Sequence, residues 1–454
     1  MKVYLVSLLF FFSSNLVAQC WQSFASGGVH SLAISSNGTL WSWGYNNYGQ
    51  LGDGSVINKN APFQIGSSNN WVFIAGGNYS SFGIKTDGTL WAWGYNGDGQ
   101  LGDGTTTDRN TPTQITSGVM NNWMRVASGT SHSLAIKTNG TLWTWGDNNY
   151  GQLGNGTNNS QPIPTQIGLA TDWTYVSTSG STSYAIKSNG TLWSWGYNNY
   201  GQLGDGTLFN KNIPTQVGNG NLWSSVKGGL GHTTALKTNG TVWAWGWNFY
   251  GQLGDSTTLD KSTPVQIGNS TAWVSIDAGY YNTFAIKNNG SLWGWGRNDY
   301  GQLGDGTNIE KIIPTQIGNQ LTWQTVDAGG LHSLAKKGDG SLYSCGVNFS
   351  GQLGIATNDN SNFLSPINCP SLTFTTFSLN SISVYPNPAL NYLNIRNDST
   401  QIIRKIKIIN FSGMNIFEKD SDFEQIEISQ LTPGFYILQI ESASNIYSYK
   451  FIKI

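Results

Sequence analysis

Residues 40–54 read LWSWGYNNYGQLGDG, and the repetition of this stretch decides the fold. The string Gly-Gln-Leu-Gly occurs seven times at a spacing of 50 residues, with a single spacing of 52. Self-similarity at a fixed period of this length indicates a repeat architecture. The seven strings begin at Gly49, Gly99, Gly151, Gly201, Gly251, Gly301 and Gly351.

One repeat contains four short stretches with strand character. In the second copy the third stretch reads Leu-Trp-Ala-Trp over residues 90–93, so apolar side chains point to both of its faces. The preceding Thr86-Asp87-Gly88 suits a tight hairpin turn, because these residues tolerate positive φ. Seven small sheets that need cover on both faces predict an all-β, seven-bladed β-propeller over residues 19–370. The strands expected in this copy are 71–75, 81–85, 89–93 and 113–115.

Four motifs of the repeat resemble those of the regulator of chromosome condensation family. They are Gly-x-x-His-Ser-Leu-Ala-Ile, the Asn-Gly turn, Leu-Trp-x-Trp-Gly-x-Asn and Tyr-Gly-Gln-Leu-Gly-Asp-Gly, and the resemblance covers all seven copies. It implies the propeller fold, but a fold does not specify an activity. The family name implies guanine-nucleotide exchange on a small GTPase, which depends on a β-wedge insertion; these copies stay at 50 to 52 residues without one. Secreted bacterial propellers of the family that inhibit hydrolases suggest a binding role instead.

The N-terminus carries a targeting signal. Lys2, the apolar run 3–12 and the small-residue sequence Leu16-Val17-Ala18 indicate a secretory signal peptide over residues 1–18. The apolar run is about half the length that a membrane span requires. Since no other stretch is apolar enough, we expect no transmembrane segment in the exported chain.

The C-terminal segment has a different composition. After a linker at 371–380, residues 381–454 predict a small β-sandwich with strands at 382–385, 392–395, 403–409, 425–428, 436–440 and 447–452. Its motifs VYPNP (384–388), IKIIN (406–410), LTPGFYI (431–437) and KFIK (450–453) resemble the type A C-terminal sorting domain of type IX secretion. The resemblance implies handling by the type IX secretion machinery. It further implies a location at the outer surface of a Gram-negative bacterium, or release from it.

Composition excludes several classes of protein. Only 10% of the 454 residues are charged, against a usual ~25%, while 20 Trp make the chain too aromatic to be disordered. The net charge of −1 argues against a nucleic-acid or anionic-membrane binder. Gly-x-Ser-x-Gly elbows, phosphate loops and dinucleotide fingerprints are missing from the sequence, so we expect no cofactor and no catalytic residue. A hydrolase or lyase site on the propeller face is a weaker alternative.

Polar residues that recur in every copy have structural interpretations. All four His occupy one repeat position, but copies two blades apart cannot bring ligands to one metal ion. We therefore expect each His to donate a hydrogen bond to a backbone carbonyl. The Gln of Gly-Gln-Leu-Gly is expected to be buried and to satisfy backbone groups between strands, and the Asp that follows to cap a turn rather than to bind calcium. The histidines are His30, His132, His232 and His332.

Aromatic residues in the loop before Gly-Gln-Leu-Gly break the repeat, and strand periodicity does not require them there. On one face of the ring they would form a binding platform for an extracellular protein or glycan. Trp247 and Phe249, with Tyr197 and Arg297 in adjacent blades, are the expected hot spot of a monomeric, non-enzymatic binding module. The remaining platform residues are Tyr45, Tyr95, Tyr48, Tyr150, Tyr200, Tyr250, Tyr300 and Phe349.

Two of the three cysteines suggest a staple that closes the ring. Cys20 aligns with Asn70, and Cys369 with Ile65, which places the two thiols on facing strands across a short loop. That separation suits a disulfide. We therefore predict a Cys20–Cys369 bridge, with Cys345 buried at a tryptophan position.

Overall fold

The computed structural model describes residues 20–116, 121–369, 382–397, 402–410, 414–442 and 446–454. The predicted signal peptide and the 371–380 linker lie outside these residues. The chain forms two compact units, one ending at Cys369 and one beginning at Pro370. Among the described residues no helix is long and apolar enough to cross a membrane.

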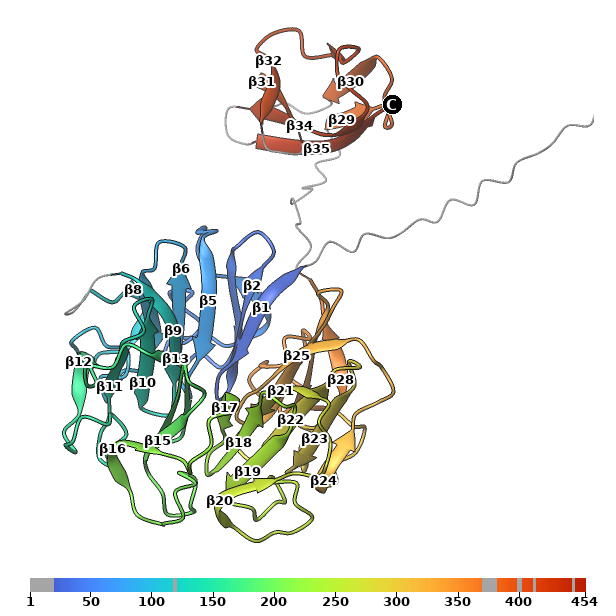
Figure 1. Ribbon diagram of the computed structural model, residues 1–454. Helices are drawn as coiled ribbons and strands as arrows, with labels where there is room; N and C mark the ends of the chain where they lie inside the picture. The colour runs from blue at the N-terminus through green and yellow to red at the C-terminus, as the bar shows by residue number, and fades with distance from the viewer. Residues whose placement is uncertain (1–19, 117–120, 370–381, 398–401, 411–413, 443–445) are drawn as a thin grey trace, which may run out of the picture. The chain divides into compact units, whose positions relative to one another are not determined.

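The first unit is a seven-bladed β-propeller, as predicted, and each blade is an antiparallel sheet of four consecutive strands (Figure 1). Blades 1 to 3 are β1 (Trp21–Ser26), β2 (His30–Ser35), β3 (Leu40–Gly44), β4 (Lys59–Gln64); β5 (Trp71–Gly76), β6 (Ser80–Lys85), β7 (Leu90–Gly94), β8 (Arg109–Gln114); and β9 (Trp123–Ser128), β10 (His132–Lys137), β11 (Leu142–Gly146), β12 (Gln161–Gln166). Blades 4 and 5 are β13 (Trp173–Ser179), β14 (Thr182–Lys187), β15 (Leu192–Gly196), β16 (Lys211–Gln216); and β17 (Trp223–Gly228), β18 (His232–Lys237), β19 (Val242–Gly246), β20 (Lys261–Gln266). Blades 6 and 7 are β21 (Trp273–Ala278), β22 (Asn282–Lys287), β23 (Leu292–Gly296), β24 (Lys311–Gln316); and β25 (Trp323–Ala328), β26 (His332–Lys337), β27 (Leu342–Gly346), β28 (Ser361–Ile367).

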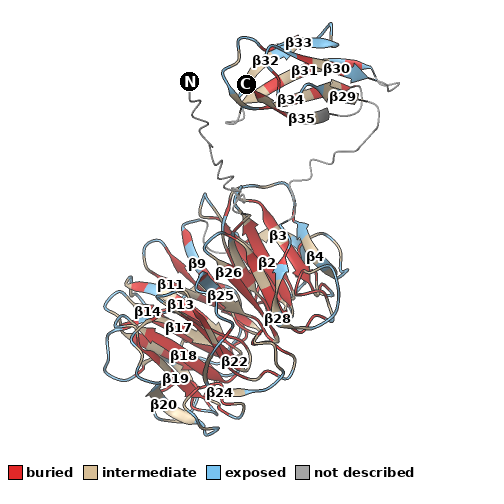
Figure 2. Ribbon diagram, turned by 90° about the vertical axis from the view of Figure 1, so that its right-hand side faces the viewer, coloured by how far each residue is buried: buried red, intermediate tan, exposed pale blue. Residues whose placement is uncertain are grey.

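The core lies between blades rather than within one, because a single sheet has no second layer of its own. Between blades 2 and 3, Phe82 and Leu90 pack against Trp123, Val126 and Trp145. The second strand of each blade is buried almost throughout, since neighbouring blades cover both of its faces (Figure 2). In the second copy the first three strands begin and end within one residue of the predicted bounds.

The fourth strand of each blade was the part predicted least well. In the second copy it runs over Arg109–Gln114, whereas the sequence suggested only 113–115. The error has a physical cause. These strands form the outer edge of each blade, where polar side chains face solvent and the apolar alternation used to recognise strands is weak.

A repeated chain of hydrogen bonds joins each blade to the next. His30 Nε2 lies 2.8 Å from Ser81 Oγ in blade 2, and Ser81 Oγ donates to the Gln50 carbonyl at 2.7 Å. The indole of Trp93 donates to the same carbonyl at 2.9 Å. The prediction that the histidines bond a backbone carbonyl was therefore wrong. Each histidine instead contacts a hydroxyl of the next blade, and it is that hydroxyl, together with the indole, that donates to the carbonyl.

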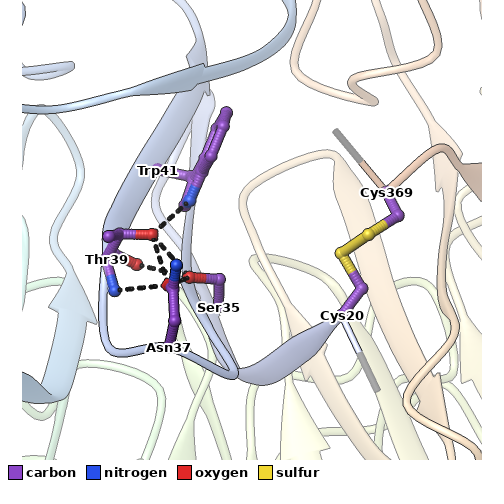
Figure 3. Close-up of a disulfide and its surroundings, with 6 residues drawn as sticks. All are labelled: Cys20, Ser35, Asn37, Thr39, Trp41 and Cys369. Atoms are coloured by element: carbon purple, nitrogen blue, oxygen red, sulfur yellow. Dashed lines mark hydrogen bonds between the residues drawn. A yellow bond between two sulfur atoms is a disulfide. The ribbon is translucent and has the colours of Figure 1, made fainter. Parts of the chain in front are cut away.

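Side chains and a disulfide close the ring, because the first and last blades are each built from one continuous segment. Ser31 Oγ lies 2.9 Å from His332 Nε2, and Lys336 Nζ donates to the Gln22 carbonyl at 2.7 Å. The predicted Cys20–Cys369 disulfide is present, with its Cα atoms 5.8 Å apart (Figure 3). Cys345 is buried, as expected for a tryptophan position.

The register behind the disulfide prediction was nevertheless wrong by two residues. Ile367, not Cys369, takes the buried position that Ile65 has in blade 1, and both side chains are 4% exposed. Cys369 lies beyond the end of β28, where the chain turns towards the start of β1. The disulfide therefore joins the residues just after β28 and just before β1, instead of joining two facing strand residues.

The second unit is a β-sandwich of two sheets. One contains β29 (Ile382–Tyr385), β30 (Tyr392–Asn397) and β33 (Gln425–Glu427); the other contains β31 (Ile403–Asn410), β32 (Asn415–Lys419), β34 (Gly434–Ser442) and β35 (Ile446–Lys453). Leu393, Ile406, Leu438 and Phe451 are central to its core. The sequence missed β32, because this edge strand mixes polar and half-exposed apolar residues.

Candidate functional site

One buried asparagine per blade shapes the loop between the third and fourth strands. In blade 1, Asn46 Oδ1 accepts the Leu51 N–H at 2.9 Å. Its Nδ2 donates to the carbonyls of Ser55 and Ile57 at 3.1 and 3.2 Å. An amide that is fully buried and bonded on both sides holds a loop in one conformation. The variable residues beside it are therefore displayed from a rigid base.

Gln and Asp of the same motif complete the loop. Gln50 is buried, as predicted, but its Oε1 accepts the Tyr48 N–H at 3.0 Å within the loop instead of a group between strands. Asp53 Oδ1 accepts the Ser55 N–H at 2.9 Å, and Lys59 Nζ lies 3.2 Å from Asp53 Oδ2. These bonds support the turn-capping interpretation of Asp53.

Eight aromatic residues and Arg297 form a continuous run of contacts on the loops of blades 3 to 6. We call this run the aromatic belt. Tyr150 and Tyr197, from neighbouring blades, have ring centroids 5.0 Å apart, and Tyr200 lies 5.4 Å from Trp247 of the next blade. We assign to the belt Tyr150, Tyr197, Tyr200, Trp247, Phe249, Tyr250, Tyr281, Arg297 and Tyr300. Tyr280, whose ring centroid lies 6.0 Å from that of Tyr281, belongs to the central channel described below.

Trp247 is the hub of the aromatic belt. Its ring contacts Tyr200, Phe249, Tyr250 and Tyr281 at centroid distances between 5.4 and 6.3 Å. The Phe249 ring lies nearly parallel to it, at an interplanar angle of 21°, and is 64% exposed. A half-buried indole with an exposed ring beside it combines a rigid anchor with available apolar area.

Arg297 is held among the rings at the blade 6 end of the belt. Its guanidinium carbon lies 5.1 Å from the Tyr250 centroid, 5.3 Å from Tyr281 and 5.7 Å from Tyr300. Asp299 pairs with it at 2.7 Å. The belt thus holds one cation, the guanidinium of Arg297, between the faces of three tyrosine rings and one carboxylate.

A second group of rings, the blade 1–2 cluster, comprises Tyr45, Tyr48, Tyr79 and Tyr95. Tyr48 is central to it, with its centroid 5.2 Å from Tyr79 and 5.0 Å from Tyr95. Burial raises the pKa of Tyr95, and the charges of Asp98 and Asp108 raise it further. Two carboxylates therefore lie near this ring.

The structure brings together most of the residues predicted to bind, but not all. Trp247, Phe249, Tyr197 and Arg297 share the aromatic belt, as does every other predicted residue of blades 3 to 6. Tyr45, Tyr48 and Tyr95 belong to the separate blade 1–2 cluster. Phe349 is 67% exposed, and among the described residues no ring contact joins it to either group.

Sequence reasoning missed Tyr79 and Tyr281, which complete both groups. They precede the repeated His position, in the loop between the first and second strands of their blades. The signal was available, because the other copies carry Val29, Ser131, Ser181, Gly231 and Leu331 at that position. The predicted platform included only the longer loop, although both loops open on the same side of a blade.

Charged residues in the central channel were missed too. The channel encloses about 350 Å³ and is lined by the inner strands of all seven blades. Lys227 pairs with Asp277 at 2.7 Å, while Asp277 Oδ2 accepts the Ala328 N–H at 2.6 Å and Asp327 Oδ1 accepts the Ser26 N–H at 2.8 Å. Each acid therefore links its blade to the next. The corresponding residues of blades 1 to 4 are Ala25, Ala75, Ala127 and Ser177, so the repeat is broken here as well.

Tyr280 extends across one end of this channel. Its hydroxyl donates to Asn78 Oδ1, which connects blade 6 to blade 2. The ring passes over Gly330 and Gly28, where an added Cβ would come within 2.8 Å of the tyrosine. Burial raises the pKa of Tyr280 above its ordinary value, so the hydroxyl stays protonated and acts as a donor.

Comparisons with known proteins agree with this architecture. A profile described as RCC1-like domain matches residues 18–274, more than half of the chain, and two regulator of chromosome condensation (RCC1) repeat profiles match 289–335 and 273–302. A secretion system C-terminal sorting domain matches residues 383–454, which marks the chain for type IX secretion and hence as secreted or cell-surface.

Individual relatives are more distant. The RCC1 domain-containing protein RUG3 of Arabidopsis thaliana is 46% identical over 41 residues, which is 9% of this chain and 9% of that protein. Human WBSCR16 superposes with a TM-score of 0.66 at 20% identity, covering 73% of this chain and 94% of its own, which shows the shared fold. Prp20p of Saccharomyces cerevisiae gives 0.62 at 25% identity over 69% of this chain and 81% of its own. With seven blades, the recurrent loop motif and a profile match over more than half its length, the chain belongs to the RCC1-like domain family.

Proposed function

We propose that this protein is a non-enzymatic binding module, exported by its sorting domain, that holds an extracellular partner on the aromatic belt. The observation that carries this proposal is the belt itself. Residues from four blades make a connected aromatic surface at positions where the scaffold does not need them. Tryptophan, tyrosine and arginine are the residue types enriched at binding hot spots.

The positions of Cys20 and Cys369 in the propeller are compatible with this role. The Ser36 N–H bonds the Cys20 carbonyl, so the bridged Cys20 and Cys369 lie beside the hairpin turn between β2 and β3. The belt loops are at the opposite end of the third strand of each blade. Cys20 and Cys369, the first and last described residues of the propeller, therefore lie at the end of the blades opposite the belt.

The alternatives have less support. The yeast neighbour Prp20p is characterised for its binding to Gsp1p and histones. In this chain all described propeller strands belong to the seven four-stranded sheets, which leaves no additional strand for a wedge. A hydrolase or lyase site would need a singular acid, base or nucleophile on the binding face. The singular groups nearest to this description, Lys227 and Asp277, are engaged with each other and with Ala328.

The test is a binding screen of the full exported chain against extracellular glycans and purified surface proteins of its own bacterium. A ligand found in this way should lose most of its affinity for the Trp247→Ala, Phe249→Ala double variant. The matched control is Leu169→Ala, which removes a 93% exposed apolar side chain between β12 and β13. Equal loss in both variants, or unchanged binding by a folded belt variant, would exclude the belt as the binding surface.

A further inference from the structure

The two aromatic groups of the propeller occupy equivalent repeat positions. Tyr45, Tyr48 and Tyr79 of the blade 1–2 cluster correspond to Trp247, Tyr250 and Tyr281 of the belt. Ring contacts are conserved between the copies: the Tyr48–Tyr79 centroids lie 5.2 Å apart, and the Tyr250–Tyr281 centroids 5.5 Å apart. The sequence thus builds the same arrangement of rings twice, in blades 1–2 and in blades 5–6.

The two copies differ in their cation. In blades 5–6 the ring faces and Asp299 surround the guanidinium of Arg297. In blades 1–2 the equivalent residue is Tyr95, and the loop supplies two exposed carboxylates, Asp98 and Asp108, without a cation between them among the described residues. The blade 1–2 cluster therefore has the rings and the negative charge, but no cation of its own.

The surrounding surface is acidic as well. The seven loops between third and fourth strands, with the first residue of the fourth strand, hold twelve acidic and six basic residues. Each of the six basic residues pairs with an acid of its own loop. The net charge of the whole chain is only −1, because lysines at the opposite face balance the excess of acidic residues in these loops. The carboxylates left without a cation in the described loops are Asp98, Asp108, Asp147, Asp260, Glu310 and Asp359.

We propose that the blade 1–2 cluster receives an arginine or lysine side chain from a basic extracellular protein, and that this face of the propeller recognises such a partner. The inference rests on the proposed function, because it assigns a partner class to the same face. A guanidinium gains from stacking on phenol rings and from pairing with a carboxylate, as Arg297 does. An acidic face also attracts a basic surface and repels a second copy of itself.

The experiment measures binding of a fluorescent deca-arginine peptide to the full chain by anisotropy, at low and at physiological salt. The test variant is Asp98→Asn, Asp108→Asn. Asn58 and Asn360 already occupy the position of Asp108 in blades 1 and 7, so the loop cap is retained. The matched control, Asp260→Asn with Asp359→Asn, removes the same charge from the same face away from the cluster. We expect the test variant to lose roughly tenfold more affinity than the control.

A second variant distinguishes the contribution of the aromatic rings from that of the carboxylates. Tyr48→Leu keeps an apolar side chain but removes the central ring face, and it should weaken deca-arginine binding several-fold at physiological salt, where diffuse attraction is screened. Equal losses in the two charge variants, or no peptide binding by the wild type, would overturn the proposal. If the wild type binds cellohexaose and Tyr48→Leu abolishes that binding, the proposal of a basic protein partner would be overturned in favour of a glycan site. That result would leave the proposed binding function intact. A ligand whose affinity does not change in the Trp247→Ala, Phe249→Ala variant would count against the proposed function alone.

Discussion

The four histidines are neutral at physiological pH for a structural reason. His132 Nε2 lies 2.9 Å from Ser183 Oγ, and that hydroxyl donates its own proton to the Gln152 carbonyl at 2.7 Å. Nε2 must therefore carry the hydrogen. Burial lowers the pKa of His132 from 6.5 to about 3, since a charged ring would have no solvent around it. Burial likewise lowers the pKa of His30 and His232 to about 3, and that of His332 to about 4.

Acid should therefore destabilise the propeller below pH 6.5. Unfolded histidine binds a proton as the pH falls below 6.5, whereas folded His132 stays neutral down to about pH 3. Between these limits His132 therefore lowers the free energy of unfolding by ~1.4 kcal/mol for each unit that the pH falls. His132→Asn, which copies Asn282 of blade 6, should reduce the slope of unfolding free energy against pH by about that amount. Urea denaturation between pH 4.5 and 7 measures it. Thr182→Ser, at the same position of blade 4, serves as control and should leave the slope unchanged.

Among the elements, the loop between the third and fourth strands does most to shape the proposed binding face. In blade 5, Asn248 Oδ1 accepts the Leu253 N–H at 2.9 Å, and Nδ2 donates to the carbonyls of Thr257 and Leu259 at 2.9 and 3.2 Å. Asn248 is completely buried between Trp247 and Phe249, which are not. The Asn248 side chain points inwards and holds the loop in one conformation. The side chains of Trp247 and Phe249 remain at the surface.

Asn248→Ala should therefore lower the free energy of unfolding by about 2 to 4 kcal/mol, because several buried backbone groups lose their partner together. Denaturant unfolding followed by tryptophan fluorescence measures the change. Phe249→Ala, one residue further and 64% exposed, should cost less than 1 kcal/mol. Similar destabilisation by both substitutions would contradict the assigned role of Asn248.

For the whole molecule, closure of the ring is the critical step, because no strand is shared between the first and last blades. The Cys20–Cys369 bridge spans 349 residues, so it restricts the unfolded chain strongly. Cys20→Ser with Cys369→Ser should lower stability by a few kcal/mol, with ~5 kcal/mol as the upper end. Thermal unfolding with and without reductant measures this. Reductant should lower the wild-type midpoint to that of the variant and leave the variant unaffected; an unchanged wild-type midpoint would show that the bridge contributes nothing.

Much of this molecule could be predicted from one repeat. Leu90, Trp91 and Trp93 define a strand covered on both faces, and seven copies of it require seven blades, because a blade without neighbours has no core. The outer strands and β32 could not be predicted as well, since solvent-facing edges carry little apolar pattern. Of the belt, the sequence indicated Trp247 and its loop neighbours but not Tyr281.

The sequence alone determined the number of blades, the apolar surfaces between them, the sorting domain and the pair of cysteines near the closure. These features follow from the repeat period and the amino-acid composition, which can be read directly from the sequence. Only the tertiary structure decided which rings meet, because Trp247 and Tyr281 come from different loops of adjacent blades and touch only when the blades are stacked. It also separated the charges of a nearly neutral chain into an acidic loop face and a face with lysines packed on tryptophans, as Lys85 is on Trp91. The spacing of residues along the chain does not show which side chains from different loops meet at one end of the blades, and the proposed binding face depends on those contacts.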